Sequence, residues 1–145
     1  MRLIKYIGVA LLMLVIISPA GADDFGKADR LICAVVDVVQ CLPGADCEET
    51  TAEEINIPWF YKFDLEKKRI EGTRAGGVKS GASIQSIQHL DKKIILQGVQ
   101  DGLKDVRDGV GWTVAIMEDT GRMVLTASGD MVGFVAFGAC TLPDK

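Results

Sequence analysis

Residues 110–141, VGWTVAIMEDTGRMVLTASGDMVGFVAFGACT, decide the fold of this chain. They contain three apolar runs, each long enough for one β-strand: 110–117, 122–128 and 131–140. Four residues separate the first two runs, and only Gly129-Asp130 separates the last two. Connections this short join only antiparallel neighbours, so the stretch predicts a β-meander.

Three segments nearer the N-terminus also have the composition of strands. Residues 31–40 are rich in valine and apolar on both faces except at Asp37, which is typical of a buried strand. Residues 59–64 alternate aromatic with polar side chains over most of their length, and a four-residue link joins them to 69–73. These two segments predict a half-buried hairpin.

Residues 83–90 are harder to assign than the other segments. Ile84, Ile87 and Leu90 recur at a spacing of three, which also suits a helical turn, but we interpret the segment as a strand. With 93–100, the chain then holds eight strands in up-and-down order. This order predicts an all-β fold, an eight-stranded antiparallel up-and-down barrel of the lipocalin-like kind, because closure removes exposed strand edges.

The connections of such a barrel alternate between its two ends. The long connections are the first, third and fifth (41–58, 74–82 and 101–109), and the short ones are the second, fourth and sixth (65–68, 91–92 and 118–121). One end, called here the loop-rich end, therefore carries the large loops. The other, called the tight end, is closed by short turns. Binding groups are commonly placed on such loops.

Residues 1–22 have the features of a secretory signal peptide. Arg2 and Lys5 precede an apolar run at 7–17, and Ala20-Gly21-Ala22 supplies a small-residue cleavage site. The apolar run is too short to span a bilayer comfortably. We therefore expect cleavage after Ala22, a single barrel domain at 23–145, and a periplasmic or secreted protein that leaves the membrane.

The charge of the mature chain limits its partners. The signal segment holds two of the 16 basic residues and none of the 20 acidic ones, so the remainder has 14 bases against 20 acids. An acidic chain without a basic cluster argues against nucleic acid and anionic lipid as partners. A protein or a small ligand is the expected partner.

Four cysteines remain after cleavage, and an even number in an exported chain predicts two disulfides. Cys33 and Cys41 lie along one strand, roughly 26 Å apart when extended, which is too far to bridge. Closure of the barrel sets the first strand beside the last, so we expect Cys33 to pair with Cys140. Cys41 then pairs with Cys47 across the Pro43-Gly44 turn. Without a C-x-x-C pair, zinc is not expected.

Known catalytic and metal-binding patterns are missing from the sequence. There is no G-x-S-x-G and no H-E-x-x-H, and His89 has no nucleophile beside it in the sequence. Asp101, Asp105 and Asp108 match no calcium loop and are interpreted as a solvated loop. The chain is therefore predicted not to be an enzyme and to need no cofactor or metal.

The loop between Cys41 and Trp59 is acidic. Thr51 and Glu54 have the spacing of a capping box, which would support one helical turn before Pro58. We interpret the acidic residues as a solvated loop rather than as a metal or partner site.

Five residues at the loop-rich end are the candidate binding residues. Trp59 and Trp112 begin strands there, and Arg74, Lys79 and Arg107 lie in its loops. Arginine is favoured because its guanidinium combines planar hydrogen bonding with stacking. The abundance of large apolar residues favours a filled barrel, which would place recognition on the surface. The sequence thus predicts a non-enzymatic exported binding module that uses the loop-rich end.

The chain also resembles known proteins. Ile95-Leu96-Gln97-Gly98, Gly111-Trp112, Thr120-Gly121-Arg122-Met123 and residues 133–140 resemble segments of small exported proteobacterial proteins with no assigned function. That resemblance implies export and no particular activity.

A second resemblance is to the periplasmic inhibitors of C-type lysozyme. The positions of Cys33 and Cys140 in a small exported barrel are similar, and Ser80-Gly81-Ala82 resembles part of their inhibitory loop. The chain departs from that family because a tyrosine shortly after this motif and a lipid-attachment cysteine are missing, and because Cys41 and Cys47 are additional. The alternative function is therefore a periplasmic inhibitor of a lysozyme or another hydrolase.

Overall fold

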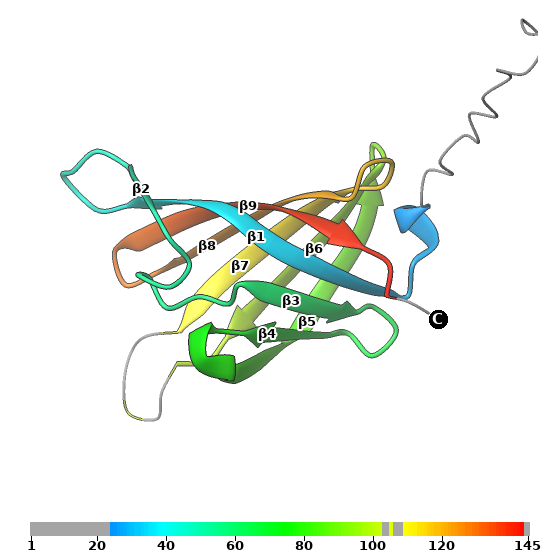
Figure 1. The fold of residues 1–145 in the computed structure, drawn as a ribbon, viewed down its shortest axis with the longest axis horizontal. Coiled ribbons are helices and arrows are strands. Elements are labelled where there is room, and N and C mark those ends of the chain that lie inside the picture. Colours follow the sequence, from blue (N-terminus) through cyan, green and yellow to red (C-terminus); the bar gives the residue numbers. More distant parts are fainter. Residues whose placement is uncertain (1–23, 103–104, 106–108, 144–145) are drawn as a thin grey trace, which may run out of the picture.

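A single antiparallel sheet closes on itself to form a barrel (Figure 1). The computed structural model describes residues 24–102, 105 and 109–143. The first strand, β1 (Arg30–Cys41), pairs with the last, β9 (Val132–Thr141), and thereby closes the sheet. Between them lie β3 (Phe60–Asp64), β4 (Arg69–Thr73), β5 (Lys79–Leu90), β6 (Lys93–Gln100), β7 (Val110–Met117) and β8 (Arg122–Gly129), in chain order. The predicted eight-stranded up-and-down barrel is confirmed.

A short ninth strand, β2 (Glu48–Thr50), lies outside this ring and was not predicted. Along β1, the neighbour β3 covers only the first part, from Arg30 to Ala34. β2 pairs with the later part of the same edge, from Val38 to Gln40. Since β1 is much longer than β3, the second half of its edge would otherwise lack a neighbour, and β2 covers it.

A β-bulge explains why β1 reads as apolar on both faces. The pairing of β1 with β9 shifts register between Val35 and Asp37, so Val36 is an extra residue. Val36 is 71% exposed, whereas Val35 and Val38, on either side of the bulge, are both buried in the barrel. The predicted strand is confirmed, but only its inner face is buried.

A second bulge explains the ambiguous spacing in β5. Its pairing with β6 shifts between Ile84 and Ser86. The extra residue, Gln85, lengthens the interval between the inward-facing Ile84 and the next apolar residue, Ile87, from two to three. The strand also begins at Lys79, four residues earlier than predicted, after the single turn η2 (Ala75–Gly77).

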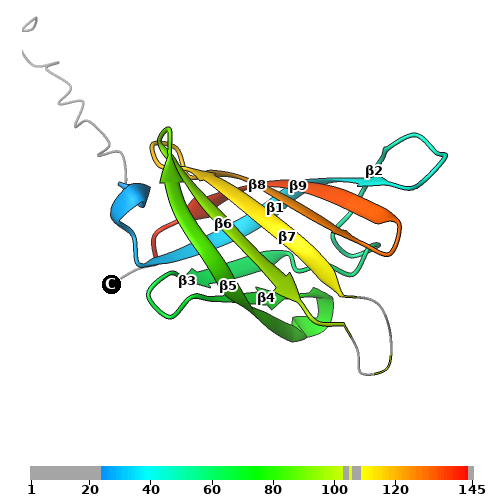
Figure 2. The ribbon, with the colours of Figure 1, turned by 180° about the vertical axis from the view of Figure 1, so that it is seen from behind.

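The two ends of the barrel differ as the order of the connections predicts. The connections after β1, β4, β6 and β8 lie at one end, and the tight turns after β3, β5 and β7 lie at the other. Figures 1 and 2 show this from both sides, with the segment before β1 at the tight end.

Large apolar side chains fill the tight half of the barrel. The largest fully buried ones come from five different strands: Leu31, Phe63, Ile94, Leu96, Val114, Ile116 and Met123. Phe25, from the turn η1 (Phe25–Lys27), is 5% exposed and closes this end. Its backbone N–H donates to the Glu118 carbonyl at 3.3 Å.

Gly121 makes room for the Phe25 ring. A Cβ at this position would lie 2.7 Å from Phe25 Cζ and 2.7 Å from the Cys140 carbonyl oxygen. Its φ of +67° also favours glycine. The turn before β8 is therefore shaped to receive the N-terminal segment.

Both predicted disulfides are confirmed. Cys33 and Cys140 face each other directly across the β1–β9 pair, and Cys41 bonds to Cys47 at the start of the loop toward β2. Two disulfides indicate an oxidising compartment, either extracellular or periplasmic. Within the part of the chain that the structure describes, no helix has the length and apolar character to cross a membrane.

The two disulfides are expected to stabilise the barrel unequally. The Cys33–Cys140 bond spans 107 residues and the Cys41–Cys47 bond spans six. Because the effect grows with the loop closed in the unfolded chain, paired alanine substitutions should lower the free energy of unfolding by about 4–5 and about 2 kcal/mol, respectively. Urea unfolding followed by circular dichroism measures both. A larger loss from the Cys41 and Cys47 pair would contradict this order.

Candidate functional site

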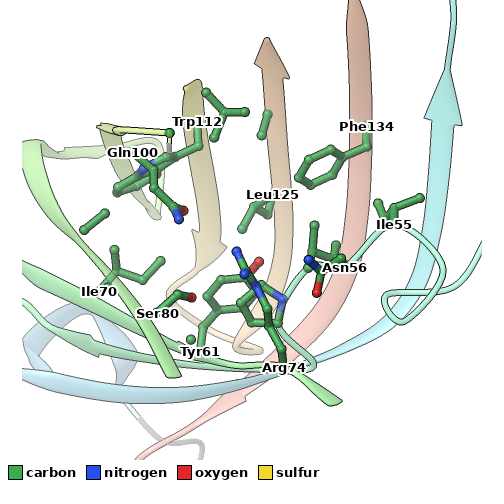
Figure 3. Close-up of a pocket in the computed structure, with 18 of the residues that line it drawn as sticks. Ile55, Asn56, Tyr61, Ile70, Arg74, Ser80, Gln100, Trp112, Leu125 and Phe134 are labelled. Atoms are coloured by element: carbon green, nitrogen blue, oxygen red, sulfur yellow. The ribbon is translucent and has the colours of Figure 1, made fainter. Parts of the chain in front are cut away.

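A cavity of about 430 Å³ lies inside the loop-rich half of the barrel (Figure 3). The inner faces of the strands form its walls, and residues 55–58 border it on one side. Most of its large lining side chains are apolar: Ile55, Ile57, Ile70, Trp112, Leu125 and Phe134. Its side-chain hydrogen-bonding groups come from Gln40, Asn56, Tyr61, Arg74, Ser80, Gln100 and Asp101.

Small inward-facing residues explain why this half is hollow. Gly72, Ser80, Ala82 and Ala127 line the cavity at positions where the tight half carries leucine, isoleucine or phenylalanine. The expectation of a filled barrel therefore holds only for the tight half. The sequence does contain a signal for the hollow half, because several strands carry small residues at the inward positions nearest the long loops. Reading it requires knowing which face of each strand points inward.

Trp112 forms one wall because Gly98 makes space for it. The two residues are direct neighbours on β7 and β6. A Cβ on Gly98 would lie 2.3 Å from Trp112 Cζ2 and 2.6 Å from the Ser83 carbonyl oxygen. The indole therefore packs over the backbone of β6 and is only 8% exposed.

The acidic loop is folded over the mouth of the barrel. The predicted capping box forms: the Glu54 N–H donates to Thr51 Oγ1 at 3.2 Å, and the Thr51 N–H donates to Glu54 Oε2 at 3.0 Å. Ala52, inside this turn, is only 2% exposed and belongs to the core. Glu48, Glu49 and Glu53 are exposed, as the solvated interpretation predicts.

The end of this loop reaches the cavity through Pro58. Pro58 is buried and packs on Gly72, where a Cβ would lie 2.3 Å from the proline Cγ. The adjoining backbone is held as well, because the Ile57 N–H donates to the Ala52 carbonyl at 2.9 Å. The border of the mouth is therefore a hydrogen-bonded and packed segment.

Arg74 is the cationic residue of the cavity. Its N–H donates to the Val78 carbonyl at 2.8 Å, and its carbonyl accepts from the Gly77 N–H at 3.1 Å. Figure 3 shows the side chain extending into the cavity. Arg74 Nε is buried and has no hydrogen-bond partner. Among the residues that the structure describes, five ion pairs form, and Arg74 takes part in none of them.

Tyr61 lies in the same cavity as Arg74. Burial raises the pKa of the Tyr61 phenol well above its ordinary value, and the nearby charge of Arg74 opposes this only in part. The phenol is protonated at neutral pH, as an ordinary tyrosine is, and can donate a hydrogen bond.

The structure brings together two of the five candidate binding residues. Arg74 and Trp112 both line the cavity. Trp59 is 37% exposed and Lys79 is exposed at the start of β5, and neither lines it. Arg107 lies outside the described residues. The polar lining residues Tyr61, Ser80 and Gln100 were not predicted from the sequence, because their inward direction depends on strand register.

Comparison of the chain with protein-family models found no match, and comparisons with curated proteins and with solved structures found none either.

The remaining sequence motifs lie apart from the cavity or in its wall. His89 and Glu118 meet at the tight end, where Nδ1 and Oε1 are 2.7 Å apart. Ser80-Gly81-Ala82, which resembles part of an inhibitory loop, lies within β5 and lines the cavity. Among the described residues no group of three potential metal ligands is found, and Asp108 of the predicted aspartate loop lies outside them.

Adding a methyl group at Gly98 should destabilise the barrel. Gly98→Ala drives a Cβ into Trp112 and into the backbone of Ser83, so the free energy of unfolding should fall by about 1–3 kcal/mol. Gly111→Ala, on the adjacent strand, is the control, because a Cβ there meets nothing within 4 Å. Its effect should stay within about 0.5 kcal/mol in urea unfolding. Equal effects of the two substitutions would contradict this account of Trp112.

The capping box should make stability depend on pH. Hydrogen bonds from the Thr50 hydroxyl, the Thr51 N–H and the Thr51 hydroxyl hold the Glu54 pKa below its ordinary value of 4.5. A lowered pKa in the folded state means that this stabilisation is complete above pH 4.5 and is lost as the pH falls further. The difference in melting temperature between the native protein and Glu54→Ala should therefore narrow below that pH. A melting-temperature difference that stays constant from pH 7 to pH 3 would refute the role of the Glu54 carboxylate.

Proposed function

We propose that this chain is an exported, non-enzymatic binding protein that takes a small, mostly apolar ligand into the loop-rich end of its barrel. The observation that carries the proposal is the cavity of about 430 Å³ in that half of the barrel. Ligand sites are typically concave, of some 300–1,000 Å³, and mostly apolar with a few fixed polar groups.

The packing around the cavity supports a ligand site rather than a defect of packing. Native cores leave few voids larger than a water molecule. Here the tight half is filled, and the hollow half is bounded by close contacts that keep it open: Trp112 lies on Gly98, and Pro58 lies on Gly72. Small residues at these inward positions give up the apolar packing that larger side chains would supply, and a binding role would explain that loss.

The construction of the barrel also suits a role outside the cytoplasm. The two disulfides fit an oxidising compartment, and the N-terminal signal peptide proposed at residues 1–22 would deliver the chain there. We propose the periplasm or the exterior as its location. A barrel that carries a poorly soluble compound needs no catalytic group, and we assign none.

Titration with N-phenyl-1-naphthylamine, a neutral apolar dye that becomes fluorescent in apolar surroundings, tests the proposal. The dye should bind with saturation at one site per chain. Ala127→Phe, which fills the cavity from β8, should weaken binding by about tenfold or more, equivalent to 1.4 kcal/mol. Thr126→Phe, the exposed neighbour on the same strand, is the matched control and should leave binding unchanged.

Two further outcomes decide the test. Ala82→Leu, from β5, fills the same cavity and replaces Ala127→Phe if that variant does not fold. A native protein that does not bind the dye, or one whose dye binding survives both filling substitutions, would refute the cavity as the binding site.

A further inference from the structure

The cavity contains one feature that a purely apolar ligand leaves unexplained. Arg74 places a permanent positive charge inside it, and the Nε of that guanidinium is buried without a hydrogen-bond partner. A buried donor with no acceptor costs free energy, and the cost is larger for a charged group. A ligand that supplies the acceptor would remove that cost on binding.

We propose that the cavity binds amphipathic monocarboxylates, whose carboxylate group pairs with Arg74 while the apolar part packs against Trp112, Leu125 and Phe134. This inference rests on the proposed function and adds to it the chemical class of the ligand.

The shape of the donor set favours a carboxylate. A guanidinium presents parallel N–H groups that match the two oxygens of a carboxylate, which a neutral hydroxyl or amide ligand cannot do. The backbone of Arg74 is already fixed by the hydrogen bonds of the 74–78 turn, so part of the ordering cost of binding is met before the ligand arrives.

The neighbouring polar groups favour an anion as well. Tyr61 lines the cavity and is protonated at neutral pH, so its hydroxyl can donate to an acceptor there and adds no negative charge. The Ser80 hydroxyl lines the same space and can also donate. Of the described residues that line the cavity, Asp101 is the acidic one, and it is exposed at the mouth.

Asp101 is exposed to solvent, so its charge should act on a ligand more weakly than the charge of Arg74 does. Charges in contact with water interact weakly, whereas the Arg74 Nε is withdrawn from water and interacts more strongly with an acceptor. The acidic net charge of the chain and Asp101 at the entrance together disfavour ligands with several negative charges. A single carboxylate fits this balance better than a phosphate or sulfate ester with a higher charge.

The apolar part of the ligand has a surface to occupy on the far wall. Leu125 is on β8, which stands across the ring from β4, the strand that leads into Arg74. Trp112 and Phe134 come from the strands on either side of β8. Figure 3 shows these side chains across the cavity from Arg74. A ligand that touches both walls must therefore be polar at one end and apolar at the other.

Competition against N-phenyl-1-naphthylamine tests this inference with three probes that share one chain length: dodecanoate, 1-dodecanol and dodecyltrimethylammonium. At neutral pH, dodecanoate should displace the dye with an affinity about 10- to 100-fold higher than that of dodecanol. The ammonium probe should be the weakest, because its charge opposes that of Arg74.

Substitution of Arg74 identifies the group responsible. Arg74→Met keeps a similar length without charge and should abolish the preference for dodecanoate over dodecanol, while dye binding remains. Lys79→Met, which removes the same charge from an exposed residue close in sequence, is the matched control and should keep the preference. Arg74→Lys should retain part of it, because the charge stays and the paired donors are lost.

The outcomes separate this inference from the proposed function. A native protein that binds the dye but shows equal affinity for dodecanoate and dodecanol would overturn the carboxylate inference and leave the binding function standing. A preference that survives in Arg74→Met, with the variant folded by circular dichroism, would overturn the role of Arg74. A protein that binds neither the dye nor dodecanoate would overturn both.

Discussion

The pairing of β1 with β9 is the constraint on which the rest of this structure depends. It removes the open edges that a meander of this length would expose, and it places Cys33 opposite Cys140, where a disulfide makes the closure covalent. Once the ring is closed, each side chain must point inward or outward, and each connection must lie at one end or the other. The division into a loop-rich end and a tight end follows directly from this.

Within that ring, the inward side chains differ in size between the two halves of the barrel. Residues such as Leu96, Ile116 and Phe63 pack the tight half as a conventional core. In the loop-rich half, Gly72 and Gly98 take the corresponding places and leave room for Pro58 and Trp112, which line the cavity. One half can therefore keep the barrel folded while the other remains hollow.

Much of the fold could be predicted from the sequence, because strand alternation, turn length and cysteine spacing are local signals. The strand order, the two ends and both disulfides follow from them. The hollow half could not be predicted, because the bulges at Val36 and Gln85 each shift the alternation by one residue. Arg74 was predicted as a surface contact, yet its side chain extends inward. Trp59 has the same aromatic character as Trp112 but remains exposed.

Phe25 closes the barrel at its tight end and leaves the cavity at the opposite end. Because that ring fills the tight end against Gly121, the interior has a floor there, and exchange with the surroundings is left to the mouth. In the part of the chain that the structure describes, the cavity is bordered by residues 55–58 at the loop-rich end, opposite this floor.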